Sequence, residues 1–369
     1  MKIEKDQIFL TNYKDQLRFH YLRGKGHLLA YAWNRFQWHN YPRWRRVARY
    51  PLHLDVELSS LCNMRCPMCY TTTQQFKESV DRAMMDFGLF KKIIDESARH
   101  GLFSIRLSLR GEPTAHPKMV EMLRYAKAAG IKEVSTLSNG LKMNEEVFEQ
   151  LLEGGLDWLT LSIDGWGETY EKIRFPAKWE EIYRKVRAFH AIKRRKGSAK
   201  PVIKVQSVWP AIERDPAYFY NLFKPYVDEV ASNPLIDFLR EDSDIEYVED
   251  FTCQYLWQRM SVGADGNIMM CQCDEMEEHV LGNAAKESIY EVWHGAKMSA
   301  IRRIHLEGKG PRTLKACKAC IYPRARESAE PVALNDQVVR VERYTKRDQR
   351  IGPKDRPAAI PAAGPGGAP

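Results

Sequence analysis

Three cysteines lie close together in the chain: Cys62, Cys66 and Cys69 are separated by three and two residues. They directly follow an apolar stretch at residues 53–58, so a loop at the end of a strand carries all three thiols. Thiolates at this spacing can bind three irons of a cubane cluster and leave the fourth iron open for a substrate. Structural zinc prefers four ligands, and the nearest further donor, His53, lies across the strand. Three buried structural cysteines are the simpler alternative.

The strand before this loop is the first of a repeating pattern. Period-two apolar stretches alternate with stretches whose apolar residues lie three and four apart, as on one face of a helix. Strands are predicted at residues 53–58, 105–109, 134–137, 158–163, 202–208 and 229–231. Six alternating strand and helix units indicate a parallel sheet with right-handed crossovers. Six units are too few for a closed eight-stranded barrel, so we predict an α/β fold with a partial (β/α)6 barrel.

This pattern stops after residue 250, where a second, smaller domain is predicted. Apolar stretches at residues 260–264 and 267–271 flank Asp265-Gly266, a pair that favours a tight hairpin turn. A helix follows, with apolar residues from Ile289 to Ile304 on its inner face. The predicted parts are a basic, aromatic-rich extension (1–52), the barrel (53–245), a small domain of a β-hairpin plus helix (246–325) and a C-terminal extension (326–369). The Gly- and Pro-rich tail from about Asp348 is predicted to be disordered.

The composition excludes several classes of protein. Of the 369 residues, 44% are hydrophobic and 28% are charged, which excludes a disordered or collagen-like chain. No apolar run approaches the roughly 18 residues of a membrane span, and the first residues do not resemble a secretory signal. We therefore predict a cytoplasmic location. In that reducing compartment, eight cysteines indicate metal ligands or catalytic thiols rather than disulfides.

Positive charge is concentrated near the amino terminus. Residues 1–52 hold 11 lysines and arginines against three acidic residues, with many aromatic side chains among them. Such a segment can bind nucleic acid, anionic lipid or a phosphorylated substrate, because arginine pairs with phosphate and stacks on aromatic rings. Alternatively, its aromatics dock on the neighbouring domain while the arginine stems lie along that surface. We favour docking, and binding to nucleic acid or to an anionic surface stays open.

The three-cysteine motif, with Tyr70 after the third cysteine, resembles the signature of the radical S-adenosylmethionine (SAM) superfamily, whose members share a partial (β/α)6 barrel. Further motifs at the predicted strand ends resemble those with which the family binds SAM. They are Gly111 and Glu112, implied to hold the methionine amino group; Ser138 and Asn139; Ser162 and Asp164, with Ser162 at the ribose; Gln206, a second ribose contact; and Arg174, at the methionine carboxylate. The resemblance covers about residues 53–240.

The resemblance implies a reaction. Cys62, Cys66 and Cys69 hold a 4Fe-4S cluster whose open iron is chelated by SAM. An external donor such as flavodoxin or ferredoxin supplies one electron, and a 5'-deoxyadenosyl radical forms and abstracts hydrogen from carbon. Arg110 replaces a glycine that the family often has before Gly111, so its cation is a candidate substrate contact.

The other cysteines resemble a second feature of the family. Cys253, Cys271, Cys317 and Cys320 resemble the ligands of the twitch subdomain, a shortened SPASM domain that holds one auxiliary 4Fe-4S cluster. Four thiolates would fully ligate this cluster and make it an electron conduit, so two clusters per chain are implied. A structural zinc site built from the same cysteines is the alternative. Cys273 is left over: it is a candidate catalytic thiol that returns hydrogen to a substrate radical, a surrogate ligand, or a buried side chain.

Members with one auxiliary cluster include enzymes that oxidise sugar-like or cyclitol alcohols. The resemblance therefore implies a dehydrogenase or epimerase acting on a polar small molecule. A radical SAM peptide maturase is the alternative, although residues 1–52 lack the pattern of a winged-helix leader-binding domain. The third interpretation of the sequence is a protein that binds nucleic acid or a membrane surface and contains a structural metal.

Overall fold

The computed structural model describes residues 8–235, 245–334, 337–344 and 351, so the predicted disordered tail lies outside the described residues apart from Ile351. The strands are β1 (Ile8–Phe9), β2 (His53–Val56), β3 (Ser104–Arg106), β4 (Glu133–Ser138), β5 (Trp158–Ser162), β6 (Val202–Val208), β7 (Glu229–Asn233), β8 (Arg259–Val262), β9 (Asn267–Met269), β10 (Val280–Asn283), β11 (Arg326–Leu334) and β12 (Gln337–Tyr344). The α-helices are α1 (Tyr13–Gly24), α2 (Leu28–Arg43), α3 (Gln74–Ser79), α4 (Phe87–Arg99), α5 (Met119–Ala128), α6 (Glu145–Glu153), α7 (Gly167–Ile173), α8 (Trp179–Arg195), α9 (Pro216–Phe223), α10 (Ile289–His294), α11 (Ala296–Leu306), α12 (Gly310–Thr313) and α13 (Lys315–Ala319).

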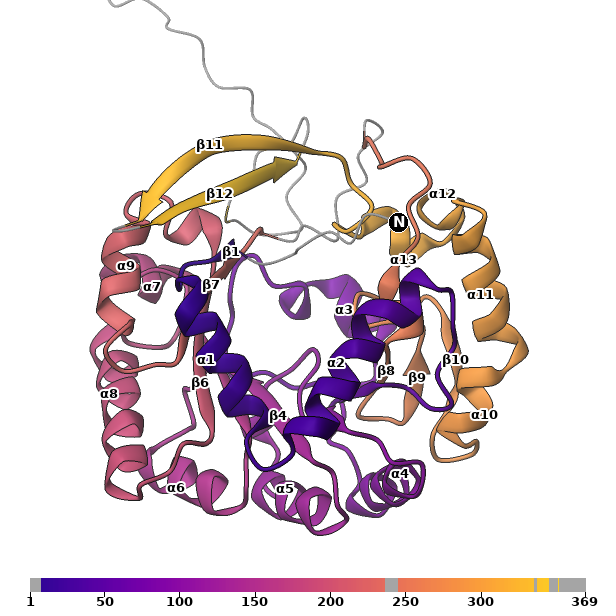
Figure 1. Ribbon diagram of the computed structural model, residues 1–369, viewed down its shortest axis with the longest axis horizontal. Helices are drawn as coiled ribbons and strands as arrows, with labels where there is room; N and C mark the ends of the chain where they lie inside the picture. The colour runs from indigo at the N-terminus through magenta and orange to yellow at the C-terminus, as the bar shows by residue number, and fades with distance from the viewer. Residues whose placement is uncertain (1–7, 236–244, 335–336, 345–350, 352–369) are drawn as a thin grey trace, which may run out of the picture.

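Ten of the described strands form one curved sheet in the order β1-β7-β6-β5-β4-β3-β2-β8-β9-β10. The six predicted strands correspond to β2 through β7, and each runs parallel to its neighbours among them. Helices α4, α5, α6, α8 and α9 surround the outer side of this sheet (Figure 1). The predicted α/β fold with an open, partial barrel is confirmed.

The strands place apolar side chains outward and polar side chains inward, as the period of two requires. Leu54 and Val56 of β2 are fully buried in the apolar core, which Phe90 of α4 also joins. Asp55 lies between them and forms an ion pair with Arg106 of β3 at 2.8 Å. The interior of the barrel is therefore polar while its wall is apolar.

The C-terminal strands extend this sheet. β8 pairs parallel to β2, with Leu54 opposite Met260, and β9 and β10 follow in antiparallel order. The predicted turn lies between β8 and β9, where Gly266 has a φ of +88°. The predicted single helix is interrupted at Gly295, which separates α10 from α11. β10 was not predicted.

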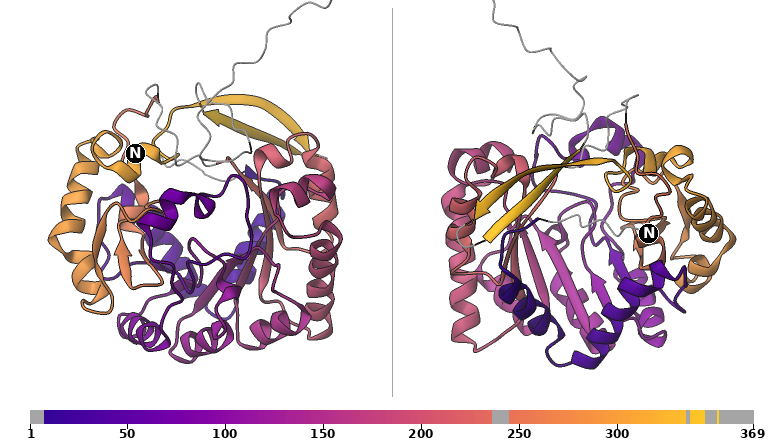
Figure 2. Two further views of the ribbon diagram at one scale, coloured as in Figure 1. Left: turned by 180° about the vertical axis from the view of Figure 1, so that it is seen from behind. Right: turned by 45° about the horizontal axis from the view of Figure 1, so that its top comes forward.

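The basic N-terminal segment contains two helices that cross the front of the barrel in Figure 1. They cover the amino ends of the strands: Arg23 of α1 pairs with Glu133, the first residue of β4, at 2.8 Å. Phe19 packs edge-on against Trp158, the first residue of β5, at 5.5 Å between ring centroids. The strands β11 and β12 form a separate hairpin near α9 and β1 (Figure 2). Among helices in the described ranges, none has the length and hydropathy of a bilayer-spanning segment.

Candidate active site

The three-cysteine loop, residues 62–69, follows β2 at the carboxyl end of the barrel strands. The loop after β3 packs directly against it, because a Cβ atom on Gly111 would lie 2.6 Å from the Leu61 carbonyl oxygen. The amide of Glu112 donates to that same oxygen at 2.9 Å. A glycine is required at residue 111, and the two loops form one unit.

The thiols of the loop fit the ligand set of an iron-sulfur cluster. The pKa of Cys62 is raised, and that of Cys66 is raised to about 12, with burial as the largest cause and the charge of Cys69 as a smaller one in both cases. The three side chains are therefore near enough to interact, and a bound metal is needed to hold Cys62 and Cys66 as thiolates at neutral pH. Asn139 Nδ2 lies 3.8 Å from Cys62 Sγ, and Thr71 Oγ1 lies 3.1 Å from Cys69 Sγ.

Glu112 connects the ends of β3 and β4. Its carboxylate accepts hydrogen bonds from Ser138 Oγ at 2.7 Å and from the Asn139 amide at 2.8 Å. Asn139 Nδ2 also donates to Asn63 Oδ1 at 2.8 Å, so β4 contacts the three-cysteine loop. Glu112 is 2% exposed, and a carboxylate held this way can accept hydrogen bonds from a ligand ammonium group.

Asp164 and Arg174 form the corresponding pair at the end of β5. Arg174 Nε donates to Asp164 Oδ2 at 2.6 Å, and the same carboxylate accepts from the Val208 amide at 2.8 Å. Arg174 Nη1 lies 4.0 Å from Cys66 Sγ. Although burial lowers it, the charges of Asp164 and Cys66 raise the pKa of Arg174 overall. A permanent cation therefore lies beside the cysteine loop, where it can bind a ligand carboxylate.

The other candidate cofactor residues lie around the same end of the barrel. Ser162 and Gln206 are register partners on β5 and β6. Tyr70 begins the short helix after Cys69 and packs edge-on against Phe76, with 5.6 Å between ring centroids. The structure thus brings the predicted residues of β3, β4, β5 and β6 to one region beside the three-cysteine loop.

The second group of cysteines is gathered in the C-terminal domain. Cys317 interacts electrostatically with Cys271, Cys320 and Cys253, and burial raises its pKa well above the usual value. Cys273, which the sequence sets apart from these four, has a pKa that the neighbouring thiols of Cys271 and Cys320, together with burial, raise well above its usual value. The five cysteines therefore lie in the same region of the domain, and one cluster needs four sulfur ligands.

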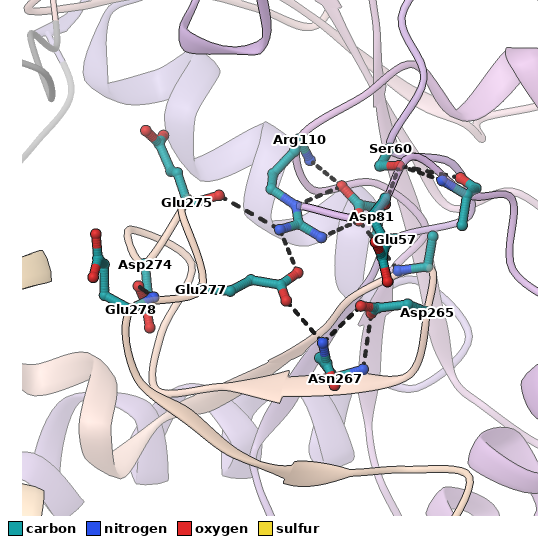
Figure 3. Close-up of polar contacts among 12 residues, drawn as sticks. Glu57, Ser60, Asp81, Arg110, Asp265, Asn267, Asp274, Glu275, Glu277 and Glu278 are labelled. Atoms are coloured by element: carbon teal, nitrogen blue, oxygen red, sulfur yellow. Dashed lines mark hydrogen bonds and ion pairs between the residues drawn. The ribbon is translucent and has the colours of Figure 1, made fainter. Parts of the chain in front are cut away.

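Arg110 joins the barrel to the C-terminal domain. Its guanidinium donates to Glu57 Oε1, at the end of β2, at 2.9 Å. It also pairs with Glu277 Oε1, between β9 and β10, at 2.6 Å, and Asn267 donates to the other oxygen of Glu277 (Figure 3). The side chain is 1% exposed. The interpretation of Arg110 as a substrate contact was wrong, because both ends of its guanidinium are occupied by protein carboxylates.

A cavity of about 410 Å³ occupies the barrel interior. Its polar lining comes from the inward positions of the strands, from the segment between β9 and β10 and from α2, and includes Arg35, Arg106, Thr160, Gln206, Arg259 and Gln272. Arg259 Nη1 donates to Gln272 at 2.6 Å, whereas its buried Nε has no hydrogen-bond partner in the described part of the chain. Gln206 was predicted from the sequence as a cofactor contact, whereas the other five were missed, because their only signal is a polar residue at an inward position.

Two domain families match the chain. Residues 56–202 match the radical SAM superfamily, and residues 253–321 match an iron-sulfur cluster-binding domain, SPASM. The tungsten-containing aldehyde ferredoxin oxidoreductase cofactor-modifying protein of Pyrococcus furiosus is 34% identical over 113 residues, 30% of each chain. The PqqA peptide cyclase of Methylobacterium nodulans is 31% identical over 112 residues, 30% of this chain and 28% of the relative. The chain thus matches about a third of the length of these curated relatives.

Solved structures share the fold over more of the chain. Native anSMEcpe with bound AdoMet has a TM-score of 0.55 at 16% identity, covering 78% of this chain and 93% of that chain. Streptococcus suis SuiB bound to precursor peptide SuiA has a TM-score of 0.53 at 14% identity, covering 80% and 76%. Identities this low show the fold alone. The two domain matches themselves identify a radical SAM domain at residues 56–202 and an iron-sulfur SPASM domain at residues 253–321, and these domains imply SAM and 4Fe-4S clusters as cofactors.

Proposed function

We propose that this chain is a radical SAM oxidoreductase or epimerase that abstracts hydrogen from a carbon of a polar small molecule, of the sugar or cyclitol class. The single observation that carries this proposal is the polar cavity of about 410 Å³ inside the barrel. Its volume suits one small ligand, since such sites typically measure roughly 300–1,000 Å³. Helices α1 and α2 lie across the amino ends of the strands that line the cavity, and this leaves little room there for an extended peptide.

We propose that the candidate residues bind two clusters and SAM. Cys62, Cys66 and Cys69 hold the first cluster, and the auxiliary cluster is held by Cys253, Cys271, Cys317 and Cys320. SAM is held by Tyr70, Gly111, Glu112, Ser138, Asn139, Ser162, Asp164, Arg174 and Gln206. When bound, SAM and the first cluster would supply a 5'-deoxyadenosyl radical beside the cavity. Gln206 lines the cavity and pairs in register with Ser162, so the reacting carbon is expected near Gln206.

The lining favours a substrate with an anionic group. Arg35 donates only to the Asn34 side chain and has no carboxylate partner among the described residues. Burial lowers its pKa to about 10, so it stays cationic at neutral pH. The unpartnered Nε of Arg259 is a second donor at the same cavity. Buried donors left without partners are rare in proteins and suit a ligand oxygen, so a sugar acid or sugar phosphate fits better than a neutral sugar.

Cys273 is the proposed hydrogen donor of the epimerase reaction. Its place against Cys271 and Cys320 supports a role near the auxiliary cluster. We propose that the enzyme acts in the cytoplasm with an external electron donor such as flavodoxin or ferredoxin, because free thiols and oxygen-sensitive clusters need a reducing compartment.

Peptide maturation is the second candidate. It is supported by the relative named PqqA peptide cyclase and by the solved SuiB structure that holds its precursor peptide. In that case the substrate would enter from the carboxyl end of the barrel, opposite α1 and α2.

The test uses reconstituted, reduced enzyme with SAM in heavy water, together with neutral sugars, sugar acids, cyclitols and short peptides. Solvent deuterium in an inverted product indicates epimerisation, and a product oxidised by two electrons indicates dehydrogenation. Turnover of peptides alone would overturn the small-molecule proposal. With an epimerase, Cys273→Ala should stop inversion while SAM cleavage continues.

A further inference from the structure

Helices α1 and α2 each carry an apolar stripe that faces away from the barrel. On α2 the stripe includes Leu29, Trp33 and Phe36, and Trp44 follows the helix; Leu29 is 90% exposed, Trp33 57% and Trp44 56%. On α1 it consists of Tyr13, Leu17 and Tyr21, which are also exposed. Spacings of three and four residues place each set along one side of its helix.

The opposite side of each helix is already buried. Phe19 of α1 and Tyr31 and Tyr41 of α2 pack into the protein, with exposures of 7% or less. The outward stripe is therefore not the side by which the helices dock on the barrel. Its rings also contact one another: Trp33 stacks on Phe36 at 5.3 Å, and Phe36 lies edge-on to Trp44 at 5.7 Å between centroids. Exposed apolar surface of this extent marks an interaction site in proteins.

The same segment is strongly basic. Seven of its lysines and arginines are exposed: Lys14, Arg18, Lys25, Arg43, Arg45, Arg46 and Arg49. Between residues 8 and 50 the sequence contains one acidic residue, Asp15. Carboxylates that could neutralise this surface are therefore almost absent from the segment.

We propose that this N-terminal aromatic face, residues 13–49, binds the surface of an anionic lipid bilayer. Tryptophan, tyrosine and leucine on one side of a helix, combined with lysine and arginine, suit the headgroup boundary, where rings enter the apolar layer and cations meet lipid phosphate. Nucleic acid would pair its phosphates with the cations but has no apolar layer that could bury Leu29. An apolar protein partner could bury Leu29 but would not pair with the lysines and arginines. The face covers the amino ends of the strands, so the three-cysteine loop at the carboxyl ends stays accessible to an electron donor.

Co-sedimentation of the full chain with vesicles tests this proposal independently of the enzyme reaction. Binding to phosphatidylcholine vesicles containing phosphatidylglycerol should exceed binding to pure phosphatidylcholine at least tenfold and should fall with salt. The triple variant Leu29→Ser, Trp33→Ser, Trp44→Ser should lose on the order of tenfold or more in binding. A second triple variant, with Arg18→Gln, Arg43→Gln and Arg49→Gln, should bind anionic vesicles roughly 100-fold more weakly than the wild type.

Matched controls separate binding from folding. Phe175→Ser and Tyr218→Ser remove exposed aromatics elsewhere and should bind as the wild type does. Circular dichroism of all variants should match the wild type. The proposal is overturned by equal binding to both vesicle types, by tighter binding to RNA or DNA than to anionic vesicles, or by a dimer that dissociates in the triple variant without vesicle binding.

Discussion

Arg110 and Glu57 form a buried ion pair at the ends of adjacent strands, with Arg110 Nε 2.9 Å from Glu57 Oε1. Because the same guanidinium also binds Glu277, one cation holds two buried carboxylates from two domains. Arg110 therefore connects the loop that packs on the three-cysteine loop to the segment between β9 and β10 in the C-terminal domain.

Arg110→Gln should destabilise the protein by about 3–5 kcal/mol, because it leaves Glu57 and Glu277 buried without a countercharge. Anaerobic urea unfolding followed by circular dichroism measures the change. Lys172→Gln is the matched control: it breaks an exposed pair with Glu168 and should change stability by about 0.5 kcal/mol or less. Equal unfolding midpoints for both variants would show that the Arg110 ion pairs contribute no stability.

The strands and the first cysteine motif could be predicted because their signals are local. Period-two alternation marks β2 through β7, and the three cysteines lie within eight residues of sequence. The contacts of Arg110 could not be predicted, since its partners lie 53 and 167 residues away. The N-terminal helices were missed for another reason: α1 and α2 have apolar residues on two sides, which obscures the helical period.

Replacing Cys62, Cys66 and Cys69 together by alanine should lower the iron content from roughly eight to about four per chain and abolish SAM cleavage. The remaining iron belongs to the auxiliary cluster and should keep the protein brown. Iron analysis and visible absorption of anaerobically purified protein check this. A colourless wild type that contains zinc would contradict both cluster assignments.

Arg35→Gln should raise KM for a sugar acid or sugar phosphate by roughly 10- to 100-fold, the contribution expected of one charged hydrogen bond. Its effect on a neutral analogue should be small. Because Arg35 has no carboxylate partner within the described ranges, the substitution leaves no buried anion unpaired there. Steady-state kinetics measure the change, and Arg43→Gln, on the exposed part of the same helix, should leave KM unaltered. Equal effects on charged and neutral substrates would argue against an anion site.

His53 should make stability decline as the pH falls from about 6.5 to about 4. Burial lowers the pKa of this imidazole from 6.5 to about 4, and it is held between Ser104 and Asp55 at 2.7 and 3.2 Å. The unfolded chain therefore takes up the proton first, so the contribution of neutral His53 is complete above pH 6.5 and lost on acidification. The loss should be on the order of 3 kcal/mol. Unfolding midpoints between pH 4 and 8 measure it, and His53→Gln, which does not titrate, should have a flatter profile; parallel profiles would show that His53 titrates alike in both states.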